Sequence, residues 1–392
     1  MPHYEYLIIG AGMAADAAVK GIRELDRSGS IGIVGQEPHP PYARPPLSKK
    51  LWQGKPLESI WCGTEAHGVT LFSGRRATAL DVANREVRDD KGGIYSYDRL
   101  LLSTGGTPRR LLFGGDKITY FRTLDDYRLL RALADAGGKF AVIGGGFIGS
   151  EIAAALAMKG REVTMLFPEP GIGSRVFPAD LAAFLTGYYH EKGVEVLAGK
   201  TVTGMRQHRQ ELLIETSSGR EISADGVVAG LGIEVNTELA TQAGLPVDNG
   251  ITVDELLRVG APDIFAAGDV ASFYNPALGK RIRLEHEDNA VAMGRQAGRN
   301  MAGAAEPYHH LPFFYSDLFE LGYEAVGELD SRLETVAYWQ EPYHKGVVYY
   351  LRDGRVSGVL LWNVWEQVDA ARSLIAEPGP FQHSDLKERI PA

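Results

Sequence analysis

The chain has 392 residues, more than one hydrophobic core usually supports, so two or three domains are expected. Lys and Arg total 41 against 50 Asp and Glu, and the net charge of −9 argues against general nucleic-acid binding, which rests on clustered cations. The sequence contains no uninterrupted apolar run of about 18 residues, so a membrane span is not expected. The first strand starts close to Met1, which predicts a cytoplasmic protein without a targeting segment.

The single cysteine, Cys62, cannot form an internal disulfide, so a catalytic dithiol within the chain is excluded. Cys62 follows two apolar residues, and a packed thiol is favoured over a nucleophile. No metal site is predicted.

The N-terminal segment has the order strand, glycine turn, helix, strand that is typical of a nucleotide-binding unit. In Gly10-x-Gly12-x-x-Ala15, the first glycine permits the tight turn and the second admits a pyrophosphate close to the backbone. Ala15 is small enough for the helix to pack on the strand. An acid at the end of the second strand should accept hydrogen bonds from ribose hydroxyls, and Glu37 suits this role better than Gln36.

The same pattern recurs near the middle of the chain as Gly144-x-Gly146-x-x-Gly149, again between a strand and a helix. The second strand of this unit ends in Glu169, whose carboxylate should accept from the adenosine 2′-hydroxyl and repel a 2′-phosphate. The sequence therefore predicts a preference for NADH over NADPH. Arg175 tempers this preference, because a nearby cation could still meet a phosphate.

The segment DIFAAGDVASF is a third candidate for cofactor binding, beside the two glycine turns. We expect an apolar strand to end at Gly268 and Asp269 to start the next helix, so that the carboxylate accepts from a ribityl hydroxyl and the helix amides face a pyrophosphate. After about residue 310 the composition becomes aromatic and β-branched, which predicts an antiparallel meander with a closing helix.

Several segments together resemble a known group. GAG at 10–12, STGG at 103–106, GGGFIG at 144–149 and AAGD at 266–269 are similar to the two-dinucleotide reductases, which include ferredoxin, rubredoxin and disulfide reductases. PYARPPLSKKLW, LFPEPGIGSR, LEHEDNAVAMGR, FFYSDLFELGYEAVG and YYLRDGRVSGVLLWNV narrow the resemblance to the apoptosis-inducing factor branch, over nearly the whole chain.

The resemblance implies an α/β fold with two Rossmann-like dinucleotide-binding domains of the glutathione-reductase kind and a C-terminal α+β domain with an antiparallel sheet. The predicted domains are the FAD-binding domain at 1–112 and 234–311, the NAD-binding domain at 113–233 and the C-terminal domain at 312–392.

The resemblance also implies roles for individual residues. Lys49 approaches the hydride-accepting nitrogen of the flavin and pairs with Glu151, while Phe147 and His286 flank the flavin and nicotinamide rings. Without the resemblance, Arg44 would be read as part of a surface ion pair, Phe147 as a core aromatic and His286 as a helix-cap histidine. The remaining contacts to FAD or NADH are assigned to Met13, Ala14, Arg44, Ala77, Thr104, Gly105, Arg122, Ile148, Gly232, Glu285, Glu324 and Asn363.

The chain also departs from the apoptosis-inducing factor pattern. Gln36 stands where the family has its ribose-binding acid, Tyr315 where it has a flavin-adjacent tryptophan, and Glu287 where it has a second histidine. The long insertion before the last strand-rich segment is missing, because YWQEPYHKGVV runs straight through. DNA binding and an apoptotic role are therefore not expected.

The leading functional hypothesis is an enzyme that takes hydride from NADH onto FAD and passes electrons to a quinone, a small redox protein or oxygen. One alternative is a ferredoxin or rubredoxin reductase with a basic docking patch, which the acidic composition supports little. Another is a redox sensor that forms a stable flavin–nicotinamide charge-transfer complex and dimerises on binding NADH.

Overall fold

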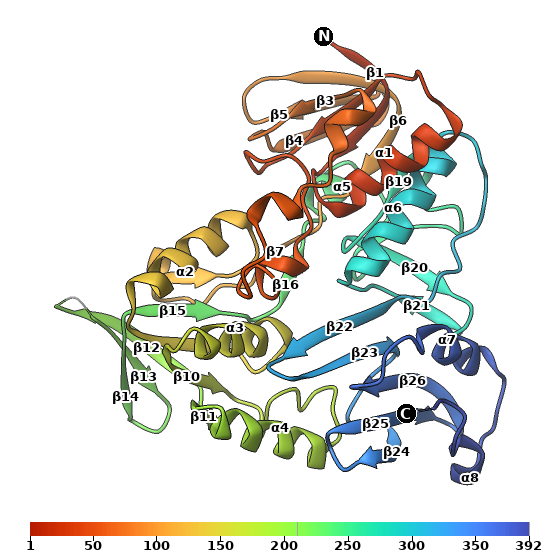
Figure 1. Cartoon of the computed structure of the whole chain (residues 1–392). Helices are drawn as coiled ribbons and strands as arrows, with labels where there is room; N and C mark the ends of the chain where they lie inside the picture. The colour runs from red at the N-terminus through yellow and green to blue at the C-terminus, as the bar shows by residue number, and fades with distance from the viewer. Residues whose placement is uncertain (210, 392) are drawn as a thin grey trace. The chain divides into compact units, whose positions relative to one another are not determined.

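A computed structural model describes residues 1–209 and 211–391 (Figure 1). Among these residues, no helix is both long enough and apolar enough to cross a bilayer. The predicted boundary between an NAD-binding domain at 113–233 and a C-terminal domain at 312–392 stays a prediction. The chain divides into two compact units, the first comprising Met1–Ala43, Leu57–Thr107 and Glu234–Pro312 and the second Arg44–Pro56, Pro108–Ile233 and Phe313–Ala392.

The first unit is built on an eight-stranded sheet with the order β18-β19-β6-β1-β2-β3, to which β5 and β4 are added beside β6. The central strands β1, β2 and β6 pair in parallel, and their apolar runs are buried because helices cover the sheet. The strands are β1 (His3–Ile9), β2 (Ile31–Val34), β3 (Val69–Phe72), β4 (Ala77–Asp81), β5 (Glu86–Asp89), β6 (Ile94–Leu102), β18 (Arg258–Val259) and β19 (Ala261–Ala266).

Two helices of the first unit, α1 (Met13–Leu25) and α6 (Glu287–Met301), pack at very close range (Figure 1). Glycines make this approach feasible: a Cβ added at Gly294 would lie 2.3 Å from the backbone oxygen of Ala14, and one at Gly298 would lie 2.0 Å from that of Ala18. The unit also contains α5 (Glu238–Gln242), η2 (Leu57–Ile60), η3 (Thr64–His67) and a small sheet of β17 (Ile251–Thr252), β20 (Ala271–Asn275) and β21 (Lys280–Ile282).

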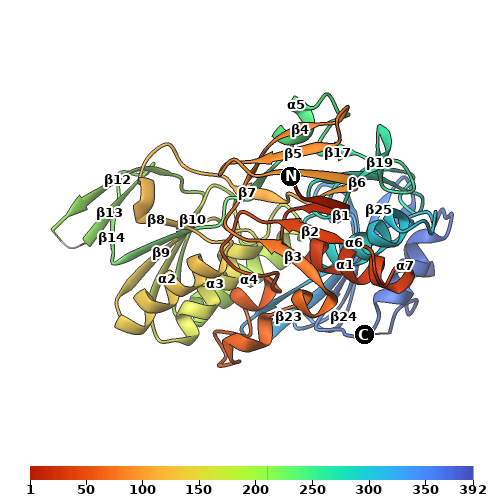
Figure 2. The same cartoon turned by 90° about the horizontal axis from the view of Figure 1, so that it is seen from above.

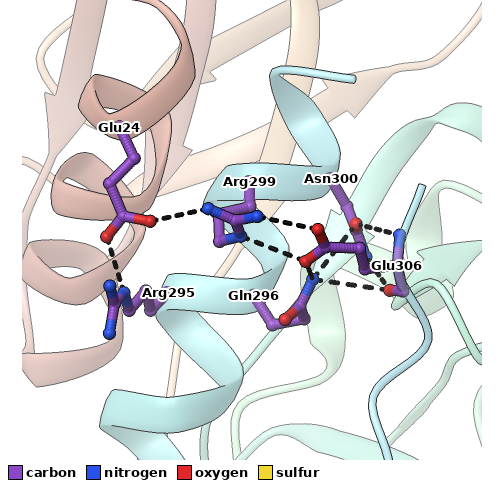
Figure 3. Close-up of polar contacts among 6 residues, drawn as sticks. All are labelled: Glu24, Arg295, Gln296, Arg299, Asn300 and Glu306. Carbon is purple, nitrogen blue, oxygen red and sulfur yellow. Dashed lines mark hydrogen bonds and ion pairs between the residues drawn. The ribbon is translucent and has the colours of Figure 1, made fainter. Parts of the chain in front are cut away.

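A polar network joins the C-terminal halves of α1 and α6 to the loop that follows α6 (Figure 3). Arg299 is its centre, with Nη1 2.8 Å from Glu24 Oε2 and Nη2 2.7 Å from Glu306 Oε1. Arg295 Nε lies 2.6 Å from Glu24 Oε1, and the Asn300 side-chain amide donates to the Glu306 backbone oxygen. These charge-assisted contacts hold the two helices and the loop in one arrangement.

The second unit contains a five-stranded parallel sheet with the order β11-β10-β9-β15-β8. Figure 2 labels β8, β9 and β10 of this sheet. Its strands read as continuous apolar runs, as expected for strands covered on both faces. Its elements are η1 (Pro45–Leu47), η4 (Gly115–Lys117), β8 (Ile118–Tyr120), α2 (Leu124–Ala136), β9 (Lys139–Ile143), α3 (Phe147–Met158), β10 (Glu162–Phe167), α4 (Ala179–Glu191), β11 (Val194–Ala198), the antiparallel β12 (Val202–His208), β13 (Glu211–Thr216) and β14 (Glu221–Ala224), and β15 (Gly226–Ala229). Two short strands, β7 (Gly106–Pro108) and β16 (Ile233–Val235), pair with each other.

The C-terminal sheet is antiparallel as predicted, but the predicted meander is wrong. Its order is β22-β23-β26-β25-β24, so the last strand lies between β23 and β25. The most apolar strands, β25 and β26, are almost wholly buried and take interior places, while β22 and the half-exposed β24 take the edges. The elements are β22 (Phe313–Leu318), β23 (Leu321–Gly327), β24 (Glu334–Glu341), β25 (Lys345–Arg352), β26 (Arg355–Trp362), the closing helix α7 (Val368–Ala376) and α8 (His383–Leu386).

Candidate functional sites

The first glycine turn forms an open cradle at the start of α1. Gly10 has φ +109°, and a Cβ there would lie 2.1 Å from the Ser103 backbone oxygen, so only glycine fits. A Cβ at Gly12, the N-cap of α1, would meet nothing within 4 Å. The first amides of α1 therefore face open space, which suits the pyrophosphate of a dinucleotide such as FAD. Met13 and Ala14 form the first turn, and the Ala15 side chain is fully buried.

The acid proposed for ribose binding lies just beyond the second strand. Glu37 Oε2 accepts a hydrogen bond of 2.5 Å from the Tyr42 hydroxyl, which fixes the carboxylate three residues after β2 ends. Gln36 beside it is exposed. The sequence did not indicate that Tyr42 positions Glu37, because the hydrogen bond between them depends on the path of the loop.

The prediction that Asp269 starts a helix is wrong. Gly268 has φ +81°, the Ala271 N–H donates to the Gly268 oxygen in a turn, and the chain continues directly into β20. The residues after Asp269 are rich in β-branched and aromatic types, which favour a strand. Asp269 can still offer a carboxylate, but the helix amides expected beside it are missing from 267–275.

His286 is the N-cap of α6, although its side chain makes no capping hydrogen bond to the helix. Burial lowers the pKa of His286 to about 4, against the opposing pull of Asp269 and Asp288, so the imidazole is neutral at pH 7. The structure thus brings Asp269 and His286 into one electrostatic neighbourhood. Glu285 pairs with Arg283 at 2.8 Å, and Glu287 is the first residue of α6.

The other predicted residues of the first unit lie at strand ends. Ala77 begins β4. The Thr104 hydroxyl donates to the Asn236 backbone oxygen at 2.7 Å, the Asn236 side-chain amide donates back to Thr104 O at 2.9 Å, and the Asn236 N–H donates to Gly105 O at 3.0 Å. Asn236 locks this segment in place, and no local pattern in the sequence indicates that role.

The second glycine turn repeats the geometry of the first at the start of α3. Gly144 has φ +118°, and its added Cβ would lie 2.3 Å from the Gly230 oxygen; at Gly149 it would lie 2.0 Å from the Gly144 oxygen. A Cβ at Gly146 would meet nothing within 4 Å, so this cradle is also open and fits a dinucleotide. Phe147 and Ile148 follow and are 36% and 37% exposed.

Glu169 lies two residues after β10 and forms an ion pair with Arg175, whose side chain is 82% exposed. The carboxylate therefore lies just beyond the strand end at which the sequence predicts a ribose-binding acid, with its cation beside it. Both residues of the predicted specificity pair come together in the structure.

Lys49 and Glu151 form a buried ion pair with 2.7 Å between Nζ and Oε1. Glu151, on α3, also accepts from the Ser48 hydroxyl at Oε2 (2.5 Å) and from the Ser316 hydroxyl at Oε1 (2.6 Å). Lys49 Nζ lies 5.2 Å from the centroid of the Tyr315 ring, within cation–π range. Sequence reasoning missed both serines.

An aromatic pair lies beside this cluster. The rings of Phe147 and Phe314 have centroids 5.1 Å apart. Phe314 shares a face of edge strand β22 with Ser316, because side chains two residues apart in a strand point to the same side. Phe147 therefore rests against the strand that carries Tyr315, and Phe314 is a further residue that the sequence did not single out.

Glu324 lies on β23 of the C-terminal sheet, and Asn363 directly follows the neighbouring strand β26. Burial raises the pKa of Glu324, and its Oε2 atom is buried without a hydrogen-bond partner in the described part of the chain. An orphaned buried acceptor of this kind fits a ligand that brings a donor, such as the carboxamide of a nicotinamide. Asn363 has φ +49°, and its amide donates to His344 O and accepts from Gly322 N–H, so much of its capacity serves the sheet.

The remaining predicted residues of the second unit are main-chain or basic groups. Gly232 has φ +79°, and its oxygen accepts from the Arg109 N–H. Arg44 Nη1 donates to the Arg122 backbone oxygen at 3.0 Å, so these two arginines lie side by side.

Comparisons with known proteins agree with this geometry. The model of the pyridine nucleotide-disulphide oxidoreductase family matches residues 4–294, and the C-terminal model of apoptosis-inducing factor, mitochondrion-associated, matches residues 297–342 and 338–377. The chain is 34% identical to apoptosis-inducing factor 1, mitochondrial, of Dictyostelium discoideum over 95% of this chain and 78% of that protein.

It is also 34% identical to the ferredoxin–NAD(+) reductase component of the anthranilate 1,2-dioxygenase system of Burkholderia cepacia, over 97% of each chain. Among solved structures, putidaredoxin reductase in its covalent complex with putidaredoxin matches with a TM-score of 0.90 and 30% identity, over 98% of this chain and 95% of that one. The chain therefore belongs to the pyridine nucleotide-disulphide oxidoreductase family, with a C-terminal region of the apoptosis-inducing factor type.

Proposed function

We propose that this protein is an FAD-dependent NADH oxidoreductase that delivers electrons to a small iron–sulfur protein. The observation that carries the proposal is the pair of open glycine cradles at Gly12 and Gly146, each at the N-terminus of a helix that follows a parallel strand. Two such cradles in one chain fit two dinucleotides. FAD, when bound, supplies an acceptor for two electrons that can be returned one at a time.

The side chains of the chain have separate tasks in this proposal. The first amides of α1 bind one pyrophosphate and those of α3 bind the other. The buried Oε2 of Glu324 accepts from the carboxamide N–H of NADH, which orients the nicotinamide. Lys49 keeps a positive charge where negative charge develops on flavin reduction, and Glu151 holds that ammonium in place. His286 stays neutral, so it adds no second positive charge.

The choice of a protein acceptor rests on two considerations. Burial raises the pKa of the Cys62 thiol to about 12, so the single cysteine offers no thiolate at neutral pH. Electrons must therefore leave to an external acceptor. Relatives include a ferredoxin–NAD(+) reductase and a reductase solved with its putidaredoxin, which favours an iron–sulfur protein over a quinone or oxygen.

An anaerobic titration of the flavin-loaded protein with NADH tests the first half of the proposal. The flavin absorbance should bleach at one equivalent of NADH, and flavin that stays oxidised at saturating NADH would overturn the proposal. Glu324→Gln should raise the KM for NADH about tenfold, because it disturbs the acceptor for the carboxamide. Glu328→Gln, on the loop after the same strand, is the matched control and should leave the KM unchanged.

Stopped-flow mixing of the reduced protein with a ferredoxin, a benzoquinone or air-saturated buffer tests the acceptor. The ferredoxin should reoxidise the flavin fastest. Faster reoxidation by the quinone or by oxygen would contradict this half of the proposal alone. Light scattering with and without NADH tests the alternative of a redox sensor, which predicts that the protein dimerises on binding NADH.

A further inference from the structure

The carboxylate of Glu151 is held by more donors than its ion pair with Lys49 requires. Ser316 and Lys49 both reach Oε1, at 2.6 Å and 2.7 Å, and Ser48 reaches Oε2 at 2.5 Å. All these side chains are buried: Glu151 is 3% exposed, Lys49 9%, Ser48 5% and Ser316 1%. The two serine hydroxyls thus give each carboxylate oxygen a neutral donor.

This arrangement has a physical purpose. A buried ion pair pays a large desolvation penalty unless the remaining lone pairs of the carboxylate receive hydrogen bonds. Ser48 and Ser316 supply those bonds from segments 103 and 165 residues away from Glu151 in sequence. Because the segments are independent, the two hydroxyls fix the carboxylate from two directions and leave it one orientation.

We propose that Ser48 and Ser316 are positioning residues whose hydroxyls fix the carboxylate of Glu151 and thereby hold the amino group of Lys49 beside the Tyr315 ring. This inference rests on the proposed function, because it assumes that the charge on Lys49 stabilises the reduced flavin. It goes further by assigning the placement of that charge to two neutral side chains that do not themselves react.

Loss of either hydroxyl has a defined consequence. With one donor fewer, the carboxylate of Glu151 is no longer fixed in one orientation, so it holds Lys49 Nζ less firmly beside the Tyr315 ring. Asp317 also interacts electrostatically with both Lys49 and Glu151, and the Tyr189 and Tyr323 hydroxyls near Glu151 stay protonated because burial raises their pKa.

The test compares Ser48→Ala, Ser316→Ala and the double variant with the wild type, each loaded with FAD. The readouts are the midpoint potential of the bound flavin and the rate constant for its reduction by NADH. Each single variant should slow reduction about tenfold, in line with the loss of one hydrogen bond to a charged group. The potential should become more negative, since a tenfold weaker preference for the reduced state corresponds to about 30 mV for a two-electron couple.

Ser357→Ala is the matched control, because Ser357 is a buried serine on β26 whose hydroxyl donates to the Tyr350 backbone oxygen at 3.2 Å. It should lower thermal stability but leave the potential unchanged. Ser48→Thr, which keeps the hydroxyl, should restore the wild-type potential.

Variants at Ser48 and Ser316 that lose thermal stability like the control but keep the wild-type potential would overturn the inference. If the double variant fails to fold, the two single variants still decide the matter. If NADH does not reduce the flavin of the wild type, the proposed function is contradicted. If NADH reduces the wild-type flavin normally and the serine variants keep the wild-type potential and rate constant, only the serine inference is contradicted.

Discussion

Helices α1 and α3 begin with the same glycine spacing, yet their surroundings differ. At α1, Ala14 and Ala15 are buried and α6 packs against the helix through backbone contacts that only glycine allows. At α3, Phe147 and Ile148 are more than a third exposed. The side of this helix that bears Glu151 packs against the buried cluster around that residue and not against a second helix. The same motif can therefore begin a helix whose first turn is partly buried or one whose first turn is exposed. A first turn packed against a second helix suits a ligand that stays bound, and an exposed one suits a ligand that exchanges.

The largest expected effect comes from removing the first glycine of each cradle. Gly10→Ala forces a left-handed residue and a Cβ contact of 2.1 Å with Ser103 O, so the purified protein should contain no flavin. Gly144→Ala creates the same problem with Gly230 O at 2.3 Å, but the protein should retain flavin and fail to be reduced by NADH. Flavin content and NADH titration measure the two outcomes.

Gly12→Ala and Gly146→Ala serve as controls, because a Cβ at either position meets no protein atom within 4 Å. Both variants should fold with normal stability and lose only affinity for the corresponding dinucleotide. If Gly144→Ala lost flavin as completely as Gly10→Ala, the assignment of one cradle to each cofactor would be wrong.

The next effect concerns protons. Because the pKa of His286 in the folded protein is lowered from 6.5 to about 4, the unfolded chain binds a proton first as the pH falls. Stability is therefore fully present above pH 6.5 and decreases by up to about 3 kcal/mol as the pH falls to about 4. Urea unfolding of the wild type and His286→Gln at several pH values should show this dependence in the wild type only.

Glu324 in the second unit should behave with the opposite sign. Burial raises its pKa, so its contribution to stability is fully present below the unfolded pKa and is lost as the pH rises through the folded pKa. Glu324→Gln should therefore stabilise the protein at pH 7 more than at pH 4. A wild-type stability curve that neither substitution alters would show that these two buried groups do not titrate with folding.

How far the sequence could predict these sites depends on the range of the interactions. Both glycine cradles were predictable, because a strand, a turn and a helix are encoded within a few residues. Ser48 and Ser316 were not, because only the tertiary fold brings them to Glu151. The prediction of a helix at Asp269 was wrong for a related reason. A Gly-Asp pair is compatible with a helix start or with a turn, and the strand-forming residues that follow favour the turn.

The order of the C-terminal strands was also beyond local patterns. An alternating or apolar run predicts a strand, but it does not state which strand will be its neighbour. Burial supplies the missing rule here: β26 and β25 are apolar along almost their whole length and therefore take interior places.

A smaller effect is expected at the network that holds α1 to α6. Arg299→Ala removes ion pairs to Glu24 and Glu306 from a side chain that is only 24% exposed, so it should lower the free energy of unfolding by about 2 kcal/mol. Arg206 in the second unit pairs with Glu221 at 2.7 Å but is 47% exposed, and Arg206→Ala should cost less than about 0.5 kcal/mol. Equal losses in urea unfolding would show that burial does not separate the two arginines.

The smallest effect tests the choice between the two forms of the nicotinamide cofactor. Glu169 repels a 2′-phosphate, while its partner Arg175 is 82% exposed and free to turn toward one once the carboxylate is removed. Glu169→Gln should therefore reduce the preference for NADH over NADPH about tenfold, or about 1.4 kcal/mol, measured as the ratio of kcat/KM values. Arg175→Ala should weaken the residual use of NADPH and thereby raise the preference for NADH. An unchanged ratio in Glu169→Gln would place the ribose elsewhere. The first unit should show no counterpart to this effect, because Glu37 is already bound to the Tyr42 hydroxyl, and its Gln variant should alter only the affinity for FAD.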